Sequence, residues 1–470
     1  MAGARGPRGS DDRFGRAYRT GIPTEIPAPP VAGPGRELAA RAAVGEAFAL
    51  RGCVLTPERP VEDGYVVVDG DRRITAVEDR RPEGVRVHDT GGVILPGLID
   101  LHGHPEFNIF AAWEPHVLFA NRYRWRASPV YRQLVRDPQN RLLEALEPQV
   151  QLRYAEVRAL VGGATAIQGA SGRLRSSEEA LVRNVDRRIF GQHRARSMID
   201  LPSAGSRDMD TLRSILADIQ TGEVTAFYIH LAEGRADDPR SGREFDRLVE
   251  FGALTPATVI IHGSALTIEQ LGQVSDAGAK LVWSPQSNLR LYGETTRAAD
   301  ALALGVPVGL GADWLPSGST SLLAELKVAA RMLAQQGNPA TARQLVEMVT
   351  AGAARIAGLG DQLGALLPGR PADLLVLERQ REDPWTNVVA ADPSWVELVV
   401  VDGDLAYGRA DWIVELTGAT EGLEPLVAWG KPMLLDTSHR AHPSGLQPPT
   451  LTQLRADLIA HYPQVGPIFA

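Results

Sequence analysis

Residues 96–108 read PGLIDLHGHPEFN, and this stretch decides how the rest of the chain is interpreted. Its apolar run ends in His102 and His104, which are two residues apart. Because side chains at positions i and i+2 of a strand point to the same side, the two imidazoles are expected to point together at the end of that strand. A lone His-x-His pair is more often incidental than metal-binding, so its meaning depends on other parts of the chain.

Three further apolar runs end in imidazole or carboxylate groups. FYIHLAEG contains His230 and then Glu233, TVIIHGS contains His262, and VPVGLGADW contains Asp313. Each alone has an ordinary explanation, since a histidine can bond a backbone carbonyl, a glutamate can lie in a solvated loop and an aspartate can cap a helix. Together they place polar groups at four strand ends, where a buried polar group needs a partner. A divalent metal would satisfy all of them, so the sequence predicts a metal site.

The pattern between these strand ends indicates the fold class. Strand-like apolar segments alternate with helical stretches, which is typical of α/β proteins with parallel strands. Strands are predicted near residues 94–102, 164–169, 195–201, 225–231, 257–262, 280–284 and 306–313, and helices in SSEEALVRNVDRR, MDTLRSILADIQ and TIEQLGQVSDAG. These are seven strands, and an eighth is not located. We nevertheless predict a (β/α)8 TIM-like barrel with its chemistry at the carboxyl ends of the strands.

The two ends of the chain are predicted to build a second, smaller domain. The tripeptide VVV followed by DGD occurs at Val66–Asp71 and again at Val399–Asp404. Each copy predicts a strand, an Asp-Gly hairpin turn and a second strand. A further helix is predicted in TLTQLRADLIAHY, near the C-terminus. The predicted division is an N-terminal arm (1–43), a composite β-sandwich domain (44–95 with 356–410), the catalytic barrel (96–355) and a C-terminal extension (411–470).

The composition favours a partner that is a small molecule. The chain has 470 residues, 44% hydrophobic and 23% charged, as in ordinary globular proteins. Its net charge of -8 gives no support for nucleic acid or a membrane surface as a partner. The N-terminus lacks the apolar segment of a secretory signal, no apolar run could span a bilayer, and the single cysteine, Cys53, fits a reducing compartment. We therefore expect a cytoplasmic protein that acts on a small-molecule substrate.

The motifs at the strand ends resemble those of the amidohydrolase superfamily. The resemblance covers about residues 45–410 and rests on PGLIDLHGH, HLAE, IIHGS, SPQSNL and GLGADW. For a mononuclear member, it implies that one metal ion is bound by a set of four residues: His102, His104, His230 and Asp313. It also implies that Glu233 shuttles protons and that His262 contacts the attacking water or the substrate oxygen. Asp313 and Glu233 are both expected to accept the proton of that water.

The lysine distribution bears on the number of metal ions. Binuclear relatives bridge two metals with a carboxylated lysine on a middle barrel strand, and no lysine occurs between His104 and His262. One divalent ion is therefore expected. Three imidazoles and one carboxylate suit zinc, which is the first expectation, and also iron, cobalt or manganese.

The segment after the first histidine pair bears on the substrate. Ring deaminases of the superfamily carry an Arg-Gly and a helix containing Leu or Trp soon after that pair, whereas this chain reads HPEFNIFAAWEPHVLFANRYRWRASPVYRQLV. With this departure and its C-terminal extension, the chain looks more like the branch of phenylurea hydrolases and molinate hydrolase, which degrade xenobiotics. We expect hydrolysis of an amide, urea or carbamate carbonyl, with cleavage of a C–N or a C–S bond. Deamination of an N-heterocycle, with release of ammonia, is the alternative.

Aromatic residues near the strand ends are expected to contact the substrate: Phe107, Trp113, Tyr292 and Trp314. The competing explanation is that they only pack the long first loop against the barrel. The arginines of RYRWR, residues 122–126, could meet an anionic substrate, although such arginines are more often solvated or paired. Since barrels of this kind commonly self-associate, we also expect a homo-oligomer, with the terminal segments as candidate subunit contacts.

Overall fold

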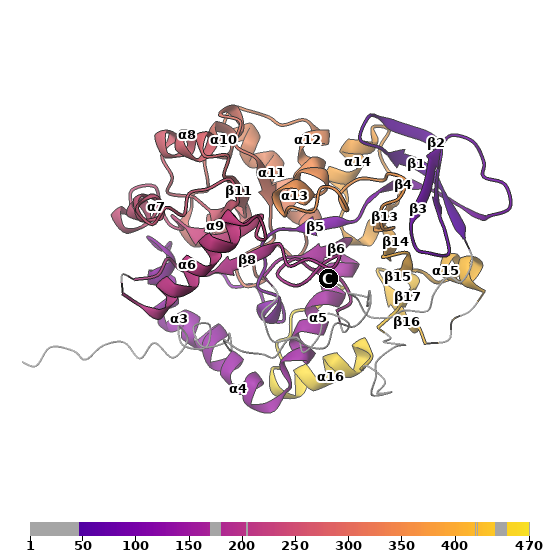
Figure 1. The fold of residues 1–470 in the computed structure, drawn as a ribbon. Coiled ribbons are helices and arrows are strands. Elements are labelled where there is room, and N and C mark those ends of the chain that lie inside the picture. The colour runs from indigo at the N-terminus through magenta and orange to yellow at the C-terminus, as the bar shows by residue number, and fades with distance from the viewer. Residues whose placement is uncertain are drawn as a thin grey trace, which may run out of the picture.

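The structure is a computed structural model that describes residues 47–169, 180–203, 205–418, 420, 422–437 and 449–469. The predicted N-terminal arm, 1–43, lies outside these ranges. Figure 1 shows a strand-rich layer, built from the indigo start and the yellow end of the coloured chain, beside a larger part with helices on its outside. Within the described ranges, no helix is both long and apolar enough to cross a membrane.

Eight strands, in a five-stranded sheet ordered β12-β11-β10-β9-β8 and a three-stranded sheet ordered β5-β6-β7, form the barrel. All pairs within these sheets are parallel. The strands are β5 (Leu98–Asp100), β6 (Ala164–Ile167), β7 (Arg183–Asn184), β8 (Ala195–Met198), β9 (Ala226–Leu231), β10 (Thr258–His262), β11 (Lys280–Trp283) and β12 (Val308–Leu310). The amide of Asp313 donates to the carbonyl of His102 at 2.8 Å, which joins the chain segments that follow β12 and β5. The predicted (β/α)8 barrel is therefore confirmed.

Helices accompany the barrel strands in the alternating order that the sequence predicts. The barrel helices are α5 (Pro148–Val161), α6 (Arg207–Gln220), α7 (Pro239–Glu250), α8 (Ile268–Asp276), α9 (Pro285–Tyr292), α10 (Ala298–Ala303), α11 (Leu322–Gln335), α12 (Ala342–Glu347) and α13 (Ala351–Ile356). MDTLRSILADIQ and TIEQLGQVSDAG, predicted to be helical, form α6 and α8. Helix α8 begins where it does because Thr267 and Gln270 form a capping box that satisfies two backbone amides of its first turn.

One helix and one strand predicted from the sequence were wrong. SSEEALVRNVDRR, residues 176–188, is predicted to be a helix. Residues 176–179 lie outside the described ranges, and the rest of the stretch contains β7, the strand that the sequence pattern did not locate. A search for hydrophobic runs does not find this strand, because it consists of two polar residues, both of which are buried. The predicted strand 94–102 is two strands, β4 (Arg86–Pro96) and β5, which are separated by Gly97. A side chain at Gly97 would lie 2.2 Å from Thr165, so the chain can pass from one sheet to the other only with glycine there.

Both ends of the described chain contribute to one sheet of nine strands, ordered β16-β17-β15-β14-β13-β4-β1-β2-β3. The strands besides β4 are β1 (Phe48–Leu55), β2 (Pro60–Val68), β3 (Ile74–Glu78), β13 (Leu374–Leu377), β14 (Val396–Val401), β15 (Asp404–Arg409), β16 (Glu424–Ala428) and β17 (Lys431–Leu435). Val66 on β2 and Leu398 on β14 belong to one buried cluster although three strands separate β2 from β14, so the sheet folds over on itself. The predicted C-terminal extension supplies β16 and β17, and the predicted domain boundaries stay a prediction.

The two VVVDGD repeats form the predicted hairpins. Strands β2 and β3 pair antiparallel, as do β14 and β15. In the second hairpin, Asp402 and Gly403 both have positive φ angles, 52° and 78°. Two successive left-handed residues are what a two-residue type I′ turn requires, and this explains the Asp-Gly pair.

Short helices lie in the first loop and at the C-terminal end. They are η1 (Pro105–Phe107), α2 (Arg122–Arg126), α3 (Pro129–Tyr131), η2 (Arg132–Arg136), α4 (Asp137–Ala145), α14 (Pro384–Ala390), η4 (Pro393–Trp395), α15 (Ala410–Thr417) and α16 (Leu451–His461). The predicted helix in TLTQLRADLIAHY is α16, which packs on α5. After α16, the amide of Gly466 donates to the carbonyl of Ile109 at 2.7 Å. The C-terminal segment thereby holds the loop that follows the first histidine pair.

A buried ion pair joins the barrel to the nine-stranded sheet. On β7, Arg183 donates to both oxygens of Asp373 at 2.8 and 3.0 Å, and to Asp402 at 2.7 Å. The side chains of Arg183 and Asp373 are 3% and 6% exposed, so neither charge is solvated by water. Charged side chains this deeply buried are tolerated only when each is paired with an opposite charge.

We predict that Arg183→Met lowers the free energy of unfolding by about 3–5 kcal/mol, because it leaves the Asp373 carboxylate buried without its cation. Chemical denaturation followed by circular dichroism measures the change. Arg213→Met is the matched control, since Arg213 pairs with Asp210 at an exposed site where a salt bridge contributes about 0–1 kcal/mol. Equal denaturation midpoints for the two variants would contradict the assigned role of Arg183.

Candidate active site

The structure brings the polar strand ends together at the carboxyl face of the barrel. His102 follows β5 by two residues, His230 lies in β9, His262 ends β10, and Asp313 follows β12 by three residues. Adjacent strand ends are held in register by the parallel pairing of β9 with β10 and by the bond between Asp313 and His102. Gly311 lies so close to His102 that a side chain on it would come within 2.4 Å of the His102 Cβ atom. The second glycine of GLGADW therefore permits this approach.

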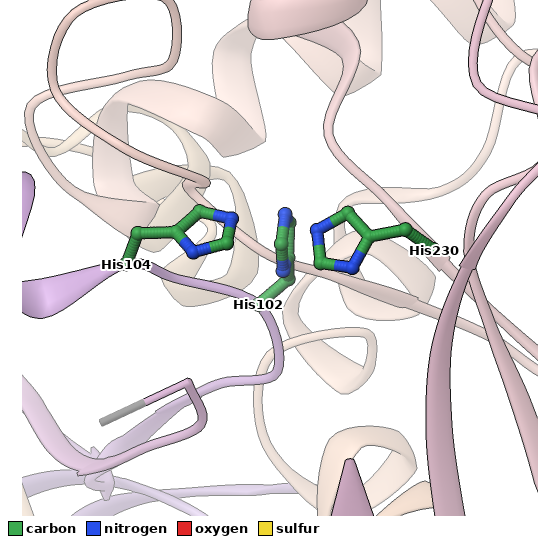
Figure 2. Close-up of side chains that lie close together, drawn as sticks. All are labelled: His102, His104 and His230. Carbon is green, nitrogen blue, oxygen red and sulfur yellow. The ribbon is translucent and has the colours of Figure 1, made fainter. Parts of the chain in front are cut away.

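His102, His104 and His230 offer three ring nitrogens within 4.8 Å of one another, and His102, His262 and Asp313 form a second such group. Figure 2 shows the imidazoles of His104 and His230 on either side of His102. The Oδ1 atom of Asp313 is 3.2 Å from Nε2 of His102 and 3.7 Å from Nε2 of His104. Three of the four predicted metal ligands thus form one group, and the fourth, Asp313, lies next to two of them.

The chemistry of this cluster fits a divalent cation. Both ring nitrogens of His102 and Nδ1 of His230 are buried and have no hydrogen-bond partner. Unpartnered buried polar atoms are costly, and a metal ion would give one nitrogen of each ring a partner. Imidazole nitrogens with a carboxylate oxygen are typical of sites for zinc and similar metals.

The protonation states also suit a cation. Burial, helped by neighbouring His102, lowers the pKa of His104 to about 3. Burial and the surrounding imidazoles hold the pKa of His230 well below its usual value. Burial alone would raise the pKa of Asp313, but the adjacent His102, together with His262 and His104, keeps that pKa below its ordinary value. At neutral pH, these two imidazoles are uncharged and Asp313 is ionised, which are the forms that bind a metal.

Glu233 and His262 face each other beside this cluster. The Oε2 atom of Glu233 lies 3.8 Å from Nε2 of His262, and Oδ2 of Asp313 lies 3.9 Å from the same nitrogen. All three side chains are at most 4% exposed. Burial lowers the pKa of His262 although Glu233 and Asp313 oppose this, so His262 is uncharged at neutral pH. The Glu233 carboxylate and the uncharged His262 imidazole are therefore both available for proton transfer.

The backbone is strained at three of these strand ends. His262, Asp313 and Ala232, the residue before Glu233, have positive φ angles of 68°, 60° and 49°. For residues other than glycine this conformation costs about 1–3 kcal/mol, and it persists only when the surroundings impose it. Such strain clusters at functional sites, and here it turns polar side chains toward the barrel mouth.

A cavity opens next to Glu233, His262 and Asp313. Its other lining residues are His104, Phe107, Arg122, Trp125, Arg126, Tyr131, Ile199, His230 and Trp314. Of the four aromatic residues predicted to contact the substrate, Phe107 and Trp314 line this cavity. Trp113 instead packs behind it, 6.2 Å from the Trp314 ring centre, and Tyr292 lies behind Glu233.

The sequence interpretation included Trp125 among the aromatic residues that could line a pocket, but it did not single out Tyr131 or Ile199. Trp125 lies in the RYRWR stretch, and its ring centre is 5.3 Å from that of Trp314 and 5.1 Å from that of Tyr131. The aromatic richness of the first loop was the available signal. Only the tertiary path of that loop decides which of its rings reach the cavity.

The arginines of RYRWR that line the cavity are paired with carboxylates. Arg122 donates to Asp200 at 3.0 Å and to Glu244 at 2.9 Å, and Arg126 donates to Asp200 at 3.2 Å. Glu244 also accepts from the amide of Ala232 at 2.8 Å. Arg122 and Glu244 therefore hold the turn that carries Glu233, and two carboxylates offset the two guanidinium charges.

Comparison with known proteins agrees with this geometry. The model of a family described as "Amidohydrolase family" matches residues 93–406, which include every strand end described above. The chain belongs to the amidohydrolase family. This amidohydrolase is 25% identical over 405 residues to a 5-methylthioadenosine/S-adenosylhomocysteine deaminase of Moorella thermoacetica, a match that covers 77% of this chain and 94% of that relative. It is 33% identical over 160 residues to the enzyme of the same name from Teredinibacter turnerae, covering 32% of this chain and only 36% of that relative.

Solved structures share the fold of this amidohydrolase. A triazine hydrolase from Arthrobacter aurescens superposes with a TM-score of 0.60 at 20% identity, covering 77% of this chain and 94% of the other. An adenosine deaminase from Xanthomonas campestris, solved with bound zinc, gives a TM-score of 0.58 at 18% identity and covers 76% and 92% of the two chains. At these identities the likeness establishes the barrel architecture. The superfamily resemblance drawn from the strand-end motifs is confirmed, whereas the phenylurea and molinate branch finds no support among these relatives.

Proposed function

We propose that this metal-dependent amidohydrolase is a hydrolytic deaminase of an aromatic N-heterocycle. The observation that carries the proposal is a cluster of three imidazoles and a carboxylate beside Glu233, at the end of a cavity walled by aromatic rings. The relative from Moorella thermoacetica, which is matched over 94% of its length, is a deaminase of adenosine derivatives. This relative favours deamination, the alternative from the sequence, over hydrolysis of an amide, urea or carbamate.

We assign one divalent ion, with zinc as the first candidate, to His102, His104, His230 and Asp313. When bound, such an ion lowers the pKa of water toward neutrality and so supplies a nucleophile at physiological pH. This ligand set is supported by its distances and by the unpartnered nitrogens of His102 and His230. The assignment of a single ion rests on the lack of lysine between His104 and His262.

Proton movement is assigned to Glu233. Its Oε2 atom, which lies 3.8 Å from Nε2 of His262, would take a proton from the attacking water, and Asp313 is placed to accept the same proton. The carboxyl group would then return that proton to the departing nitrogen, which leaves as ammonia. The ring carbon gains the water oxygen and loses its amino group, so the reaction consumes one water for each ammonia released. His262 is placed to hold the attacking water beside Glu233.

The walls of the cavity fit a planar, uncharged ring. Phe107, Trp125 and Trp314 present aromatic faces, and the nearby arginines are neutralised by their carboxylates. Stacking of a heteroaromatic ring on such side chains would orient the ring carbon toward Glu233 and exclude bulk water. A small-molecule substrate and a homo-oligomeric state remain part of the proposal.

A two-part substrate panel tests the proposed reaction. We expect ammonia release from amino-substituted heterocycles such as 5′-methylthioadenosine, S-adenosylhomocysteine and adenosine, because their flat rings fit between the aromatic walls. We expect no amine release from a phenylurea, an anilide or a thiocarbamate. Ammonia is measured by a coupled dehydrogenase assay and amines by chromatography, with Glu233→Gln enzyme as the background control. Turnover confined to the second group would overturn the deaminase proposal in favour of carbonyl hydrolysis.

A further inference from the structure

One helix, α9, contacts both groups assigned to proton handling from behind. Asn288 and Tyr292 are four residues apart on α9 and therefore lie on the same face of the helix. Asn288 bonds His262, and Tyr292 bonds Glu233. We infer that α9 is a positioning element, in which Tyr292 and Asn288 decide which oxygen of Glu233 and which nitrogen of His262 do chemistry. This inference rests on the proposed function for its catalytic consequence but not for its structural content.

The direction of the bond between Tyr292 and Glu233 is fixed by a third residue. The indole nitrogen of Trp125 is 2.9 Å from the hydroxyl of Tyr292, and an indole N–H can only donate. The Tyr292 hydroxyl therefore accepts from Trp125 and gives its one hydrogen to Oε1 of Glu233. Burial and the adjacent Glu233 raise the pKa of Tyr292 well above its usual value, so the hydroxyl keeps this hydrogen.

This bond leaves one oxygen of Glu233 free for catalysis. Oε1 already accepts from Tyr292, so a proton taken up by the carboxylate goes to Oε2. Oε2 is the atom that faces His262 across 3.8 Å. Trp125 lines the cavity and Tyr292 is fully buried behind it. The hydrogen bonds from Trp125 to Tyr292 and from Tyr292 to Glu233 therefore connect the aromatic wall of the cavity to the carboxylate assigned to proton transfer.

The tautomer of His262 follows from an equivalent argument. The hydroxyl of Thr296 donates its one hydrogen to the carbonyl of His262 at 2.7 Å. The Thr296 hydroxyl can therefore only accept a hydrogen bond from Asn288. The Asn288 atom 3.2 Å from this hydroxyl is the amide nitrogen, which is a donor. The amide oxygen of Asn288 must then face Nδ1 of His262, 2.9 Å away, and Nδ1 must carry the hydrogen.

A neutral His262 with its hydrogen on Nδ1 presents a lone pair at Nε2. Nε2 then accepts a hydrogen bond from the attacking water and cannot donate one to a substrate oxygen. Of the two roles that the superfamily resemblance implies for His262, this selects contact with the water. The gap of 3.8 Å to Glu233 is too long for a direct hydrogen bond, so both atoms are free to contact a third group between them.

Two substitutions on α9 test the inference. Tyr292→Phe keeps the ring and removes the hydrogen given to Oε1, and we expect kcat to fall about 10- to 100-fold, as for other partners that orient a catalytic group. KM and metal content should stay near their wild-type values, because Tyr292 is not among the residues that line the cavity. Gln286→Ala, on the same helix and away from both catalytic groups, is the control and should leave kcat unchanged. A kcat for Tyr292→Phe equal to that of the control would overturn the role of Tyr292.

The tautomer is measured without any turnover. In zinc-loaded protein labelled with ¹⁵N-histidine, we expect His262, assigned by its loss in His262→Gln, to be protonated at Nδ1 and bare at Nε2. Asn288→Leu removes the acceptor and should shift His262 toward the other tautomer, whereas Gln286→Ala should not. A wild-type His262 protonated at Nε2 would overturn the role of Asn288. Since this measurement needs no substrate, it stands even where the deaminase panel fails.

Discussion

Glu233→Gln is expected to lower kcat by about 10²- to 10⁴-fold, the contribution of a positioned general acid–base group. The substitution preserves shape and hydrogen bonding at the site. Tyr292 donates to the Oε1 position, so the amide oxygen of glutamine takes that place and its nitrogen takes the place of Oε2. The variant then carries a group at the cavity that can neither accept a proton from water nor return one to a leaving nitrogen.

The measurement is steady-state kinetics on a substrate from the panel, together with metal analysis and thermal unfolding of both proteins. Metal content and the melting temperature should match the wild type, because Glu233 is not among the assigned ligands. Glu250→Gln at the exposed end of α7 is the control for the loss of one carboxylate. Wild-type turnover by Glu233→Gln would refute the proton-transfer role, and loss of the metal would instead make Glu233 part of the metal site.

The strand ends were predictable because a barrel imposes them. His102, His230, His262 and Asp313 each close an apolar run, and parallel strands that alternate with helices bring their carboxyl ends to one face. A polar group at such a position cannot stay buried without a partner, so four coinciding polar ends indicate a common ligand. This argument needs only the order of residues along each run, which is why the predicted cluster appears in the structure.

Strand β7 and the role of Tyr292 could not be predicted, because they depend on tertiary contacts that no local sequence pattern indicates. Strand β7 has two polar residues, and the burial of Arg183 is explained only by its pairing with Asp373, which directly precedes β13 of the other sheet. Similarly, Tyr292 was expected to touch the substrate, but its hydroxyl is taken up by Glu233 and Trp125. Neither pairing leaves a local pattern, since each joins segments more than 50 residues apart.

The sequence of the first loop was the reason for predicting an amide, urea or carbamate substrate and not a heterocycle for deamination. HPEFNIFAAW departs from the pattern of ring deaminases, yet the relatives matched over most of their length are deaminases. The physical reason is that this loop leaves the barrel after His104 and does not set the ligand positions, which the strand ends fix. The loop sequence can therefore change while the histidine cluster and Glu233 stay in place. It predicts the lining of the cavity better than it predicts the reaction.

His230→Ala is expected to abolish the metal site and, with it, activity. The change removes one of three imidazoles that surround a common point and leaves Nε2 of His102 with fewer neighbours to share a cation. Since loss of even an outer partner weakens metal binding by about 10- to 100-fold, loss of a direct ligand should weaken it by at least about 100-fold. Without the ion, water keeps a pKa of about 15.7 in place of a value near 7, and no residue of the cavity supplies an equivalent nucleophile.

Elemental analysis and activity measured on the same dialysed preparations decide this prediction. The wild type should retain about one divalent ion per chain, in line with a mononuclear site, and titration of stripped protein with zinc, cobalt, iron or manganese shows which ion restores turnover. His116→Ala is the control, because His116 is exposed on the first loop and lies outside both candidate ligand groups. If His230→Ala kept its metal and its activity while His116→Ala behaved in the same way, the ion would have to be held without β9, and the assignment of the strand ends as its ligands would fail.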